Sequence, residues 1–368
     1  MIHLRAPGRI CLFGEHQDYL NLPTISMAIS KYIYLEAERI ERQIFIIELP
    51  DLNETIEIKL NGKELEYFSK RDYIRSGYNV FLRKGFKYQK GYRIKITGDI
   101  PINAGVASSS ALVIAWLSFL NLLNYERTKL NSYQIAIEGY NAEVEEFAEA
   151  GGMMDHFTSV YGSLVCLDSR GLKPEILNKS NKLEGFVLGN SLQIKNTVDD
   201  LARVKQISIE AFEKLKEAMP DFNRYTSSIE EVNVYLPNLN KKYQKKIIGN
   251  VLNRDITIKA KNLIFNKDLT RNIEVNELKN NFYQSLGHLL NLHHKQLRNN
   301  IEISTMKIDS LISSCIENGA IGAKINGSGF GGTMFALHPG YEEKIKKIIE
   351  DNGAEGFIIK TSNGVESY

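Results

Sequence analysis

The feature that most constrains this chain is a short apolar segment followed at once by three ionisable side chains. Residues 10–13 (Ile-Cys-Leu-Phe) are typical of a buried strand, and Glu15, His16 and Asp18 come directly after Gly14. Two carboxylates and an imidazole at the end of a buried strand are costly unless they meet each other or a polar ligand. Two interpretations stay open at this point: a charged turn after a strand, and one side of a polar binding site.

The length and composition indicate a globular protein with two lobes. The chain has 368 residues, of which 43% are hydrophobic and 24% are charged. A net charge of +2 gives no reason to expect nucleic acid or an anionic membrane as a partner. The longest apolar run, residues 111–123, is too short to span a bilayer, and the N-terminus has no apolar signal segment. We therefore expect a cytoplasmic protein with no membrane partner.

Hydrophobic periodicity places strands early in the chain and helices later. The apolar run 111–123 predicts a helix in the core, and we place the boundary between two lobes at residue 175, giving lobes 1–175 and 176–368. The β-rich or alternating segments that predict strands are residues 32–38, 43–49 and 55–60.

A loop of small residues leads directly into the predicted core helix. Residues 102–112 (Ile-Asn-Ala-Gly-Val-Ala-Ser-Ser-Ser-Ala-Leu) would let an anion approach the main chain, where the helix N-terminus offers free N–H groups and a positive dipole end. The hydroxyls of Ser108 and Ser109 can add hydrogen bonds or bind a metal ion. The alternative is an ordinary serine N-cap. The loop is not a Walker loop, because the Gly-Lys-Ser/Thr ending is absent.

A second predicted helix, residues 132–150, carries five glutamates. At about 100° per residue, Glu138, Glu145 and Glu149 lie opposite the apolar stripe and should be solvated. Glu143 lies at the edge of the buried face. It is therefore the glutamate best placed to serve a site.

Two further segments supply candidate site residues. Asp155 lies between Met154 and Phe157, which suggests either a buried carboxylate with a perturbed pKa or the N-cap of the next helix. Residues 326–332 (Asn-Gly-Ser-Gly-Phe-Gly-Gly) permit unusual backbone angles and close approach to a ligand. Taken alone, this glycine-rich segment could also be an elaborate hairpin turn.

Residues 7–19, 101–109 and 326–332 together resemble, in order and spacing, the three motifs of the GHMP kinase superfamily. The first is most similar to the galactokinase signature Gly-Arg-x-Asn-Leu-Ile-Gly-Glu-His-x-Asp-Tyr. The twelve-residue step from Glu143 to Asp155 also resembles galactokinases. Three motifs in the right order are more specific than any one of them.

The resemblance implies an α+β chain with the two-lobed GHMP kinase fold and an active site in the cleft between the lobes. It implies a kinase that depends on ATP and Mg2+ and phosphorylates the anomeric (C1) hydroxyl of galactose or a closely related sugar. It further implies a monomer or weak homodimer. The alternatives are a GHMP kinase for another acceptor (a uronic acid, a pentose or a mevalonate-like alcohol) and a non-catalytic relative that senses sugar and ATP.

The resemblance also implies roles for individual residues. Asp155 falls on the catalytic aspartate and Arg9 on the active-site arginine. The positions that bind the sugar are Glu15, His16, Asp18 and Gly152. The magnesium ligands are Ser109, with Ser108 as the alternative, and Glu143. The residues that bind the nucleotide are Asn103, Ala104, Gly105, Val106, Ala107, Ser108, Ser109, Ser110, Gly327 and Gly329.

The chain departs from the galactokinase pattern at three places. Cys11 replaces the asparagine of the first motif, and residues 20–24 replace a glycine-containing turn. Residues 199–205 stand where a Tyr-x-x-Arg-Arg segment is expected. All three places are near the acceptor side, so they leave the kinase prediction intact and open the choice of sugar.

Overall fold

The computed structural model describes residues 1–102, 104–124, 129–168, 173–176, 183–193, 197–265 and 276–368. Asn103, one of the predicted nucleotide-binding residues, lies outside these ranges. The strands are β1 (Ile2–Phe13), β2 (Thr24–Ile40), β3 (Ile44–Leu49), β4 (Glu54–Lys59), β5 (Gly91–Gly98), β6 (Leu164–Asp168), β7 (Lys173–Ile176), β8 (Phe186–Asn190), β9 (Gly322–Asn326), β10 (Thr333–Leu337), β11 (Glu355–Ile359) and β12 (Glu366–Ser367). The α-helices are α1 (Tyr73–Arg83), α2 (Ser108–Leu123), α3 (Ser132–Tyr140), α4 (Met154–Tyr161), α5 (Thr197–Ala218), α6 (Ile229–Asn233), α7 (Lys241–Phe265), α9 (Asn276–Gln296), α10 (Met306–Glu317) and α11 (Glu342–Asp351). Short π-helical segments follow α3 (Asn141–Glu145) and α9 (Leu297–Ile301).

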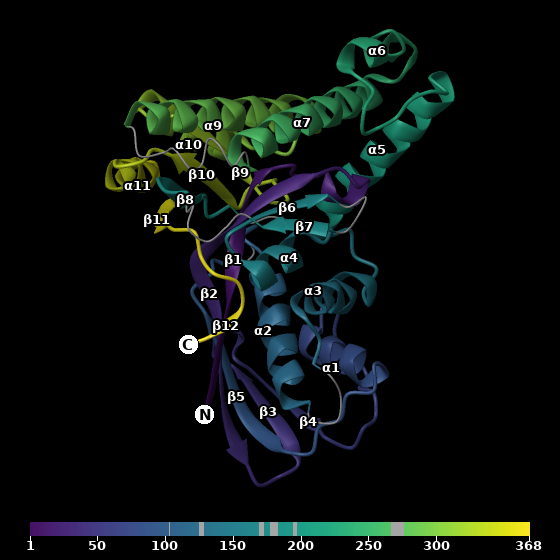
Figure 1. The fold of residues 1–368 in the computed structure, drawn as a ribbon, viewed down its shortest axis with the longest axis vertical. Helices are drawn as coiled ribbons and strands as arrows, with labels where there is room; N and C mark the ends of the chain where they lie inside the picture. The colour runs from purple at the N-terminus through teal and green to yellow at the C-terminus, as the bar shows by residue number, and fades with distance from the viewer. Residues whose placement is uncertain (103, 125–128, 169–172, 177–182, 194–196, 266–275) are drawn as a thin grey trace.

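The larger sheet is organised around the long strand β2. Its strand order is β12-β1-β2-β5-β3-β4, with β6 pairing with the first part of β2 and β7 pairing with β6. The pair β3–β5 is parallel, whereas β1, β5 and β6 all run antiparallel to β2. The last strand, β12, returns to pair with β1, so both chain termini lie beside the same sheet (Figure 1).

Helix α2 forms the core of this half of the molecule. The sequence predicted a core helix over 111–123, and the helix is there but begins at Ser108. Trp116 is fully buried and donates its indole N–H to the Ile74 carbonyl at 2.9 Å. Because burial of a large aromatic side chain is worth several kcal/mol, this contact fixes α2 against α1 and the sheet.

The second sheet has the strand order β11-β8-β10-β9, and all its neighbouring strands are antiparallel. Its first strand along the chain is β8. Helices α7 and α9 lie side by side across this half (Figure 1). The division into lobes 1–175 and 176–368 stays a prediction. Within the described part of the chain, none of the helices combines the length and the apolar character needed to cross a bilayer.

The turn that follows β1 is held by helices from the second half of the chain. Leu20 and Leu22 are buried in a separate apolar cluster with residues of α5, α6 and α7. Gln17 donates a hydrogen bond to the Asn250 carbonyl at 2.8 Å, and Arg224 donates to the Leu20 carbonyl at 3.1 Å. The segment with the unusual cluster of charges is therefore packed against helices from the second half of the chain rather than left as a surface turn.

Candidate active site

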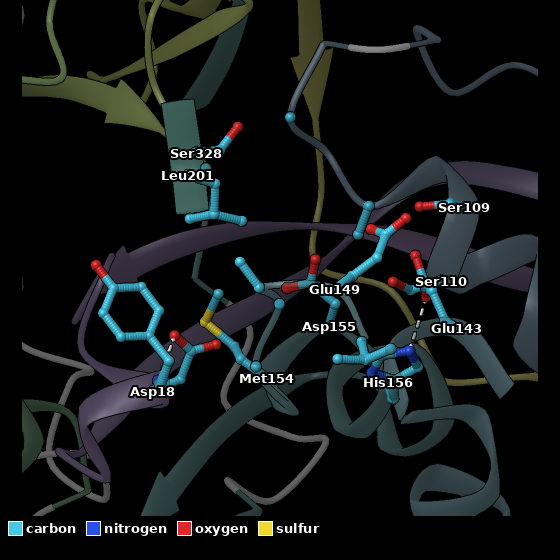
Figure 2. Close-up of a pocket in the computed structure, with 18 of the residues that line it drawn as sticks. Asp18, Ser109, Ser110, Glu143, Glu149, Met154, Asp155, His156, Leu201 and Ser328 are labelled. Atoms are coloured by element: carbon cyan, nitrogen blue, oxygen red, sulfur yellow. Dashed lines mark hydrogen bonds and ion pairs between the residues drawn. The ribbon is translucent and has the colours of Figure 1, made fainter. Parts of the chain in front are cut away.

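The three sequence motifs meet at one pocket between the two sheets. Figure 2 shows Asp155 between Asp18 on one side and Ser109 and Ser110 on the other. The predicted site residues that line this pocket are Arg9, Glu15, His16, Asp18, Gly105, Ala107, Ser108, Ser109, Ser110, Glu143, Gly152, Asp155 and Gly327.

Arg9 and Asp155 form the centre of this pocket. The Nε and Nη2 groups of Arg9 donate to the two carboxylate oxygens of Asp155 at 2.7 and 2.6 Å. The side chain of Arg9 is 6% exposed and that of Asp155 is 24% exposed. The carboxylate is therefore open to the pocket while the guanidinium stays behind it. Such a bidentate pair fixes the orientation of both groups.

Arg9 also connects the first motif to the other two. Its Nη1 group donates to the Gly105 carbonyl at 2.6 Å, and Asn326 Nδ2 donates to the same oxygen at 2.9 Å. Gly105 and Gly327 both have positive φ angles, and a Cβ atom at Gly327 would lie 2.4 Å from the Gly105 oxygen. Glycine is therefore required at position 327 by the close approach of the loop before α2.

The start of α2 differs from an ordinary serine cap. The N-cap residue is Ala107, which has a left-handed backbone (φ 61°) and makes no side-chain cap hydrogen bond. Ser108, Ser109 and Ser110 occupy the first turn instead and line the pocket. The cap alternative is therefore wrong, and the helix N-terminus faces the pocket in the way that suits an anion.

Glu143 lies opposite these serines. Its Oε2 accepts a hydrogen bond from His156 Nε2 at 2.7 Å, drawn as a dashed line in Figure 2. Burial opposes its ionisation, but hydrogen bonds from His156, Ser109 and Ser110 outweigh burial and hold the pKa of Glu143 below its ordinary value. A charged carboxylate and a serine hydroxyl thus face the same space.

Two of the other glutamates do not follow the sequence prediction. Glu138 is buried and pairs with Lys84 at 2.8 Å, because α3 packs between α2 and α4. Glu149 lines the pocket and forms an ion pair with Arg71. The helix predicted over 132–150 ends with the π-helical segment Asn141–Glu145, so Glu149 lies beyond the helix and a regular 100° projection does not apply to it.

Asp18 and His16 form the opposite wall of the pocket. A Cβ atom at Gly152 would lie 1.8 Å from Asp18 Oδ2, so the two residues are in direct contact. Burial and the nearby charge of Asp155 raise the pKa of Asp18 to about 6. His16 Nδ1 lies 2.9 Å from the Tyr19 hydroxyl, and its Nε2 lies 3.1 Å from the Ser328 carbonyl.

Glu15 reaches the pocket but is committed to a buried ion pair. One carboxylate oxygen binds the ammonium group of Lys324, which also donates to the carbonyls of Cys11 and Ile325 at 3.0 and 2.8 Å. The other oxygen lies 3.5 Å from His293 Nδ1. Burial raises the pKa of Glu15, although the charge of Lys324 opposes this shift. Sequence reasoning missed Lys324, because it lies just before the glycine-rich segment 326–332 and a single lysine does not by itself indicate a site.

Three predicted nucleotide-binding residues are not among those that line the pocket. Ala104 and Val106 are buried, and their carbonyls accept hydrogen bonds from Thr333 Oγ1 at 2.9 Å and from the Arg9 main-chain N–H at 3.1 Å. Gly329 packs against Ile303, where a Cβ atom would lie 2.6 Å from the Cβ of Ile303. These residues hold the loops together, and their assignment to nucleotide binding stays a prediction.

A second, apolar hollow adjoins the serine turn, and sequence reasoning did not find it. It shares Ser108 and Ser109 with the first pocket. Leu52, Phe68 and Ile102 line it and are strongly exposed, at 55%, 76% and 57%. Clustered exposed apolar side chains mark a surface that another molecule covers.

Other lining residues that were missed are Tyr19, Arg71, Tyr73, Val144, Ala150, Gly151, Met154, His156, Leu201 and Ser328. Several are neighbours of the motif residues and could have been included on position alone. Leu201 belongs to residues 199–205, which the family resemblance places near the acceptor side, whereas Arg71 belongs to a segment without a motif, so only the fold reveals it.

Family models match three parts of the chain. The galactokinase galactose-binding signature matches residues 2–39, the GHMP kinases N terminal domain matches residues 72–163, and the GHMP kinases C terminal model matches residues 275–355. The galactokinase of Thermotoga maritima is 30% identical over 381 residues, and that of Pyrococcus furiosus is 26% identical over 380 residues. Each alignment covers 99% of both chains.

Solved structures show the same fold. The galactokinase of Lactococcus lactis complexed with galactose aligns with a TM-score of 0.83 at 20% identity, covering 100% of this chain and 95% of that one. The mevalonate kinase of Methanococcus jannaschii aligns with a TM-score of 0.70 at 19% identity, covering 98% of each chain. These likenesses confirm the predicted two-lobed α+β fold. With the family models and the full-length relatives, they show that the chain belongs to the galactokinase family of GHMP kinases and is an ATP-dependent sugar kinase.

Proposed function

We propose that the enzyme transfers the γ-phosphoryl group of ATP to the C1 hydroxyl of galactose, with Asp155 and Arg9 as the catalytic residues. The observation that carries this proposal is the Arg9–Asp155 pair, which lies between the serine turn and the Asp18 wall. A pocket with anion-binding groups on one side and hydroxyl-binding groups on the other suits a phosphate donor and a polyol acceptor.

The chemistry of the transfer follows from this placement. The acceptor oxygen forms a bond to the γ-phosphorus as the bond from phosphorus to the ADP oxygen breaks, and Asp155 accepts the hydroxyl proton. Arg9 keeps the Asp155 carboxylate oriented toward the acceptor and supplies positive charge next to the transferring group. Since Arg9 also holds the Gly105 carbonyl, the same side chain aligns the base with the phosphate loop.

Acceptor recognition is assigned to the wall formed by His16, Asp18 and Gly152. Carboxylate and imidazole groups pair with sugar hydroxyls, whereas an apolar pocket would leave those hydroxyls unmatched. Galactose is the acceptor that the relatives in Thermotoga maritima and Lactococcus lactis support by name. The monomeric or weakly dimeric state and the cytoplasmic location stay predictions.

Magnesium fits the donor set of Ser109 and Glu143. Glu143 is charged and hydrogen-bonds to Ser109 across the pocket. Among the described residues there is no group of three or more His, Cys, Asp or Glu side chains that could hold a metal alone, so phosphate oxygens would complete the coordination. When bound there, the ion would neutralise the β- and γ-phosphate charges.

The apolar hollow with Leu52, Phe68 and Ile102 is assigned to the adenosine part of ATP.

The test is a screen of free sugars for ADP formation, followed by NMR location of the phosphate on the product. We expect galactose to be phosphorylated at C1. Asp155→Asn should lower kcat by roughly a hundred-fold or more and leave ATP binding, measured by calorimetry, unchanged. Full activity in this variant would refute the assignment of the base, and a product phosphorylated elsewhere would refute the acceptor geometry.

A further inference from the structure

Arg71 lies where three hollows of the structure meet, and no step described above uses it. It lines the main pocket together with Ser109 and Glu143. It also lines the apolar hollow together with Phe68, and a third hollow beside α5 together with Lys205. A side chain at this junction would contact the segment of a nucleotide that joins its base to its terminal phosphate.

The backbone at Arg71 is held in an uncommon conformation. Its φ angle is 69°, in the left-handed region, and its carbonyl accepts the Tyr73 N–H at 2.8 Å. Asp72 then caps α1 by accepting the Arg75 N–H at 3.4 Å. A residue with a side chain costs roughly 1 kcal/mol or more in this region, and such strain gathers at functional sites. The turn before α1 therefore directs the guanidinium to the pocket at an energetic cost.

The guanidinium of Arg71 is restrained by one partner. Its Nε and Nη2 groups donate to the two oxygens of Glu149 at 2.5 and 2.8 Å. Glu149 therefore occupies the Nε–Nη2 edge of the guanidinium, an edge that a bidentate phosphate group would also use. The Arg71 side chain is 36% exposed and that of Glu149 is 18% exposed, so the pair is accessible from the pocket. Figure 2 shows Glu149 in the same hollow as Glu143 and Asp155.

The pocket is lined by more acidic than basic side chains, so a phosphate group bound there needs a cation besides Arg9. The carboxylates among its described lining residues are Glu15, Asp18, Glu143, Glu149 and Asp155, and the lysine or arginine side chains among them are Arg9 and Arg71. Arg9 is already bound to Asp155 and to the Gly105 carbonyl. A polyphosphate would add negative charge to a site that is already acidic, and opposite charges must offset it.

We propose that Arg71 is a further residue that binds the phosphates of the nucleotide, and that Glu149 holds it in place until the nucleotide arrives. This inference rests on the proposed function for the presence of ATP in the pocket. A carboxylate and a phosphate bind the same face of a guanidinium, so Glu149 competes with the nucleotide for Arg71. The two residues should therefore have opposite effects on nucleotide affinity.

A matched control is present in the same segment. Arg83 Nη1 pairs with Glu146 at 2.7 Å, and these side chains are 43% and 16% exposed. This pair also joins the α1 region to the segment after α3, yet it lines none of the three hollows. Arg83→Met should therefore report any general effect of losing such an ion pair.

The experiment measures binding of ATP, tripolyphosphate and adenosine by calorimetry to the full-length parent, Arg71→Met, Glu149→Gln and Arg83→Met. Arg71→Met should weaken ATP and tripolyphosphate by roughly ten-fold to a hundred-fold, as expected for lost hydrogen bonds to a charged group. It should weaken adenosine binding much less than tripolyphosphate binding, although Arg71 also lines the apolar hollow, and it should leave the KM of the sugar unchanged. Glu149→Gln should strengthen ATP binding by roughly two-fold to five-fold, and Arg83→Met should change nothing.

The opposite signs separate this proposal from a purely structural ion pair. If Glu149→Gln weakened ATP binding as Arg71→Met does, or if Arg83→Met matched Arg71→Met, the pair would only support packing and the proposal would be wrong. Unchanged tripolyphosphate binding in Arg71→Met would also overturn it. A parent protein that bound no ATP would overturn the proposed function itself, whereas the other outcomes leave that function standing.

Discussion

Asp18 should lower the stability of the protein at neutral pH, and asparagine at this position should raise it. Burial and the charge of Asp155 raise the pKa of Asp18 from 3.8 to about 6. A carboxyl group with a higher pKa in the folded state binds its proton more tightly there than in the unfolded chain. Folding stability therefore falls as the pH rises from 3.8 through about 6, and it stays reduced above that range.

The magnitude follows from the difference between the two pKa values. A rise from 3.8 to about 6 is about 2, and each pKa unit corresponds to about 1.36 kcal/mol, so the upper limit is about 3 kcal/mol. Asparagine carries no charge and can still accept the Tyr19 N–H, which Asp18 Oδ1 accepts at 2.9 Å. We expect Asp18→Asn to increase the free energy of unfolding by about 1–3 kcal/mol at pH 7.5.

Urea unfolding followed by tryptophan fluorescence is a suitable assay, because Trp116 is the single tryptophan of the chain and is fully buried. The parent, Asp18→Asn and the exposed control Asp221→Asn are compared at pH 4.0 and pH 7.5. The gain for Asp18→Asn should be large at the higher pH and small at the lower one, with no gain for the control. An Asp18→Asn variant that is no more stable than the parent at pH 7.5, or a gain independent of pH, would refute the reasoning.

Two further substitutions test the packing of the acceptor wall. A Cβ atom at Gly152 would lie 1.8 Å from Asp18 Oδ2. Gly152→Ala should therefore raise the KM of the sugar by roughly ten-fold or more without changing the KM of ATP. A KM of the sugar equal to that of the parent would contradict this. Lys324→Met leaves Glu15 buried without its partner and should lower the free energy of unfolding by about 3–5 kcal/mol. Adding Glu15→Gln should recover most of that loss in the same urea assay, and no recovery would show that Lys324 contributes packing rather than charge.

Local patterns in the sequence predicted the parts of the site that depend on neighbouring residues. The small-residue loop and the apolar run predicted a helix with an anion-binding start, and α2 begins at Ser108 with its first turn at the pocket. The charges after residues 10–13 left a charged turn and a polar site open, and Glu15, His16 and Asp18 all line the pocket, although Glu15 is also paired with Lys324. Glu143, predicted as the glutamate best placed to serve a site, lines the pocket, and Glu149 lines it as well.

The remaining site residues depend on contacts that no local pattern encodes. Glu15 and Lys324 are 309 positions apart and meet because β9 packs directly against the end of β1. Arg71 comes from the turn before α1, where neither periodicity nor a motif indicates a function. Glu149 was placed in solvent because the prediction extended the helix to residue 150, whereas the helical segment ends at Glu145 and Glu149 lies beyond it. In each case the tertiary fold, rather than residue type, decides which partner a charged side chain meets.

The Gly105 carbonyl explains why three motifs so far apart in sequence function together. A carbonyl oxygen has two lone pairs, and here Arg9 donates to it at 2.6 Å while Asn326 donates at 2.9 Å. With both partners in place, the loop before α2 is tied to β1 and to β9 at one atom. Arg9 is in turn tied to Asp155. A shift of the loop before α2 would therefore move Asp155, the proposed base, as well, so Arg9 is the residue that couples the proposed donor side of the pocket to the proposed acceptor side.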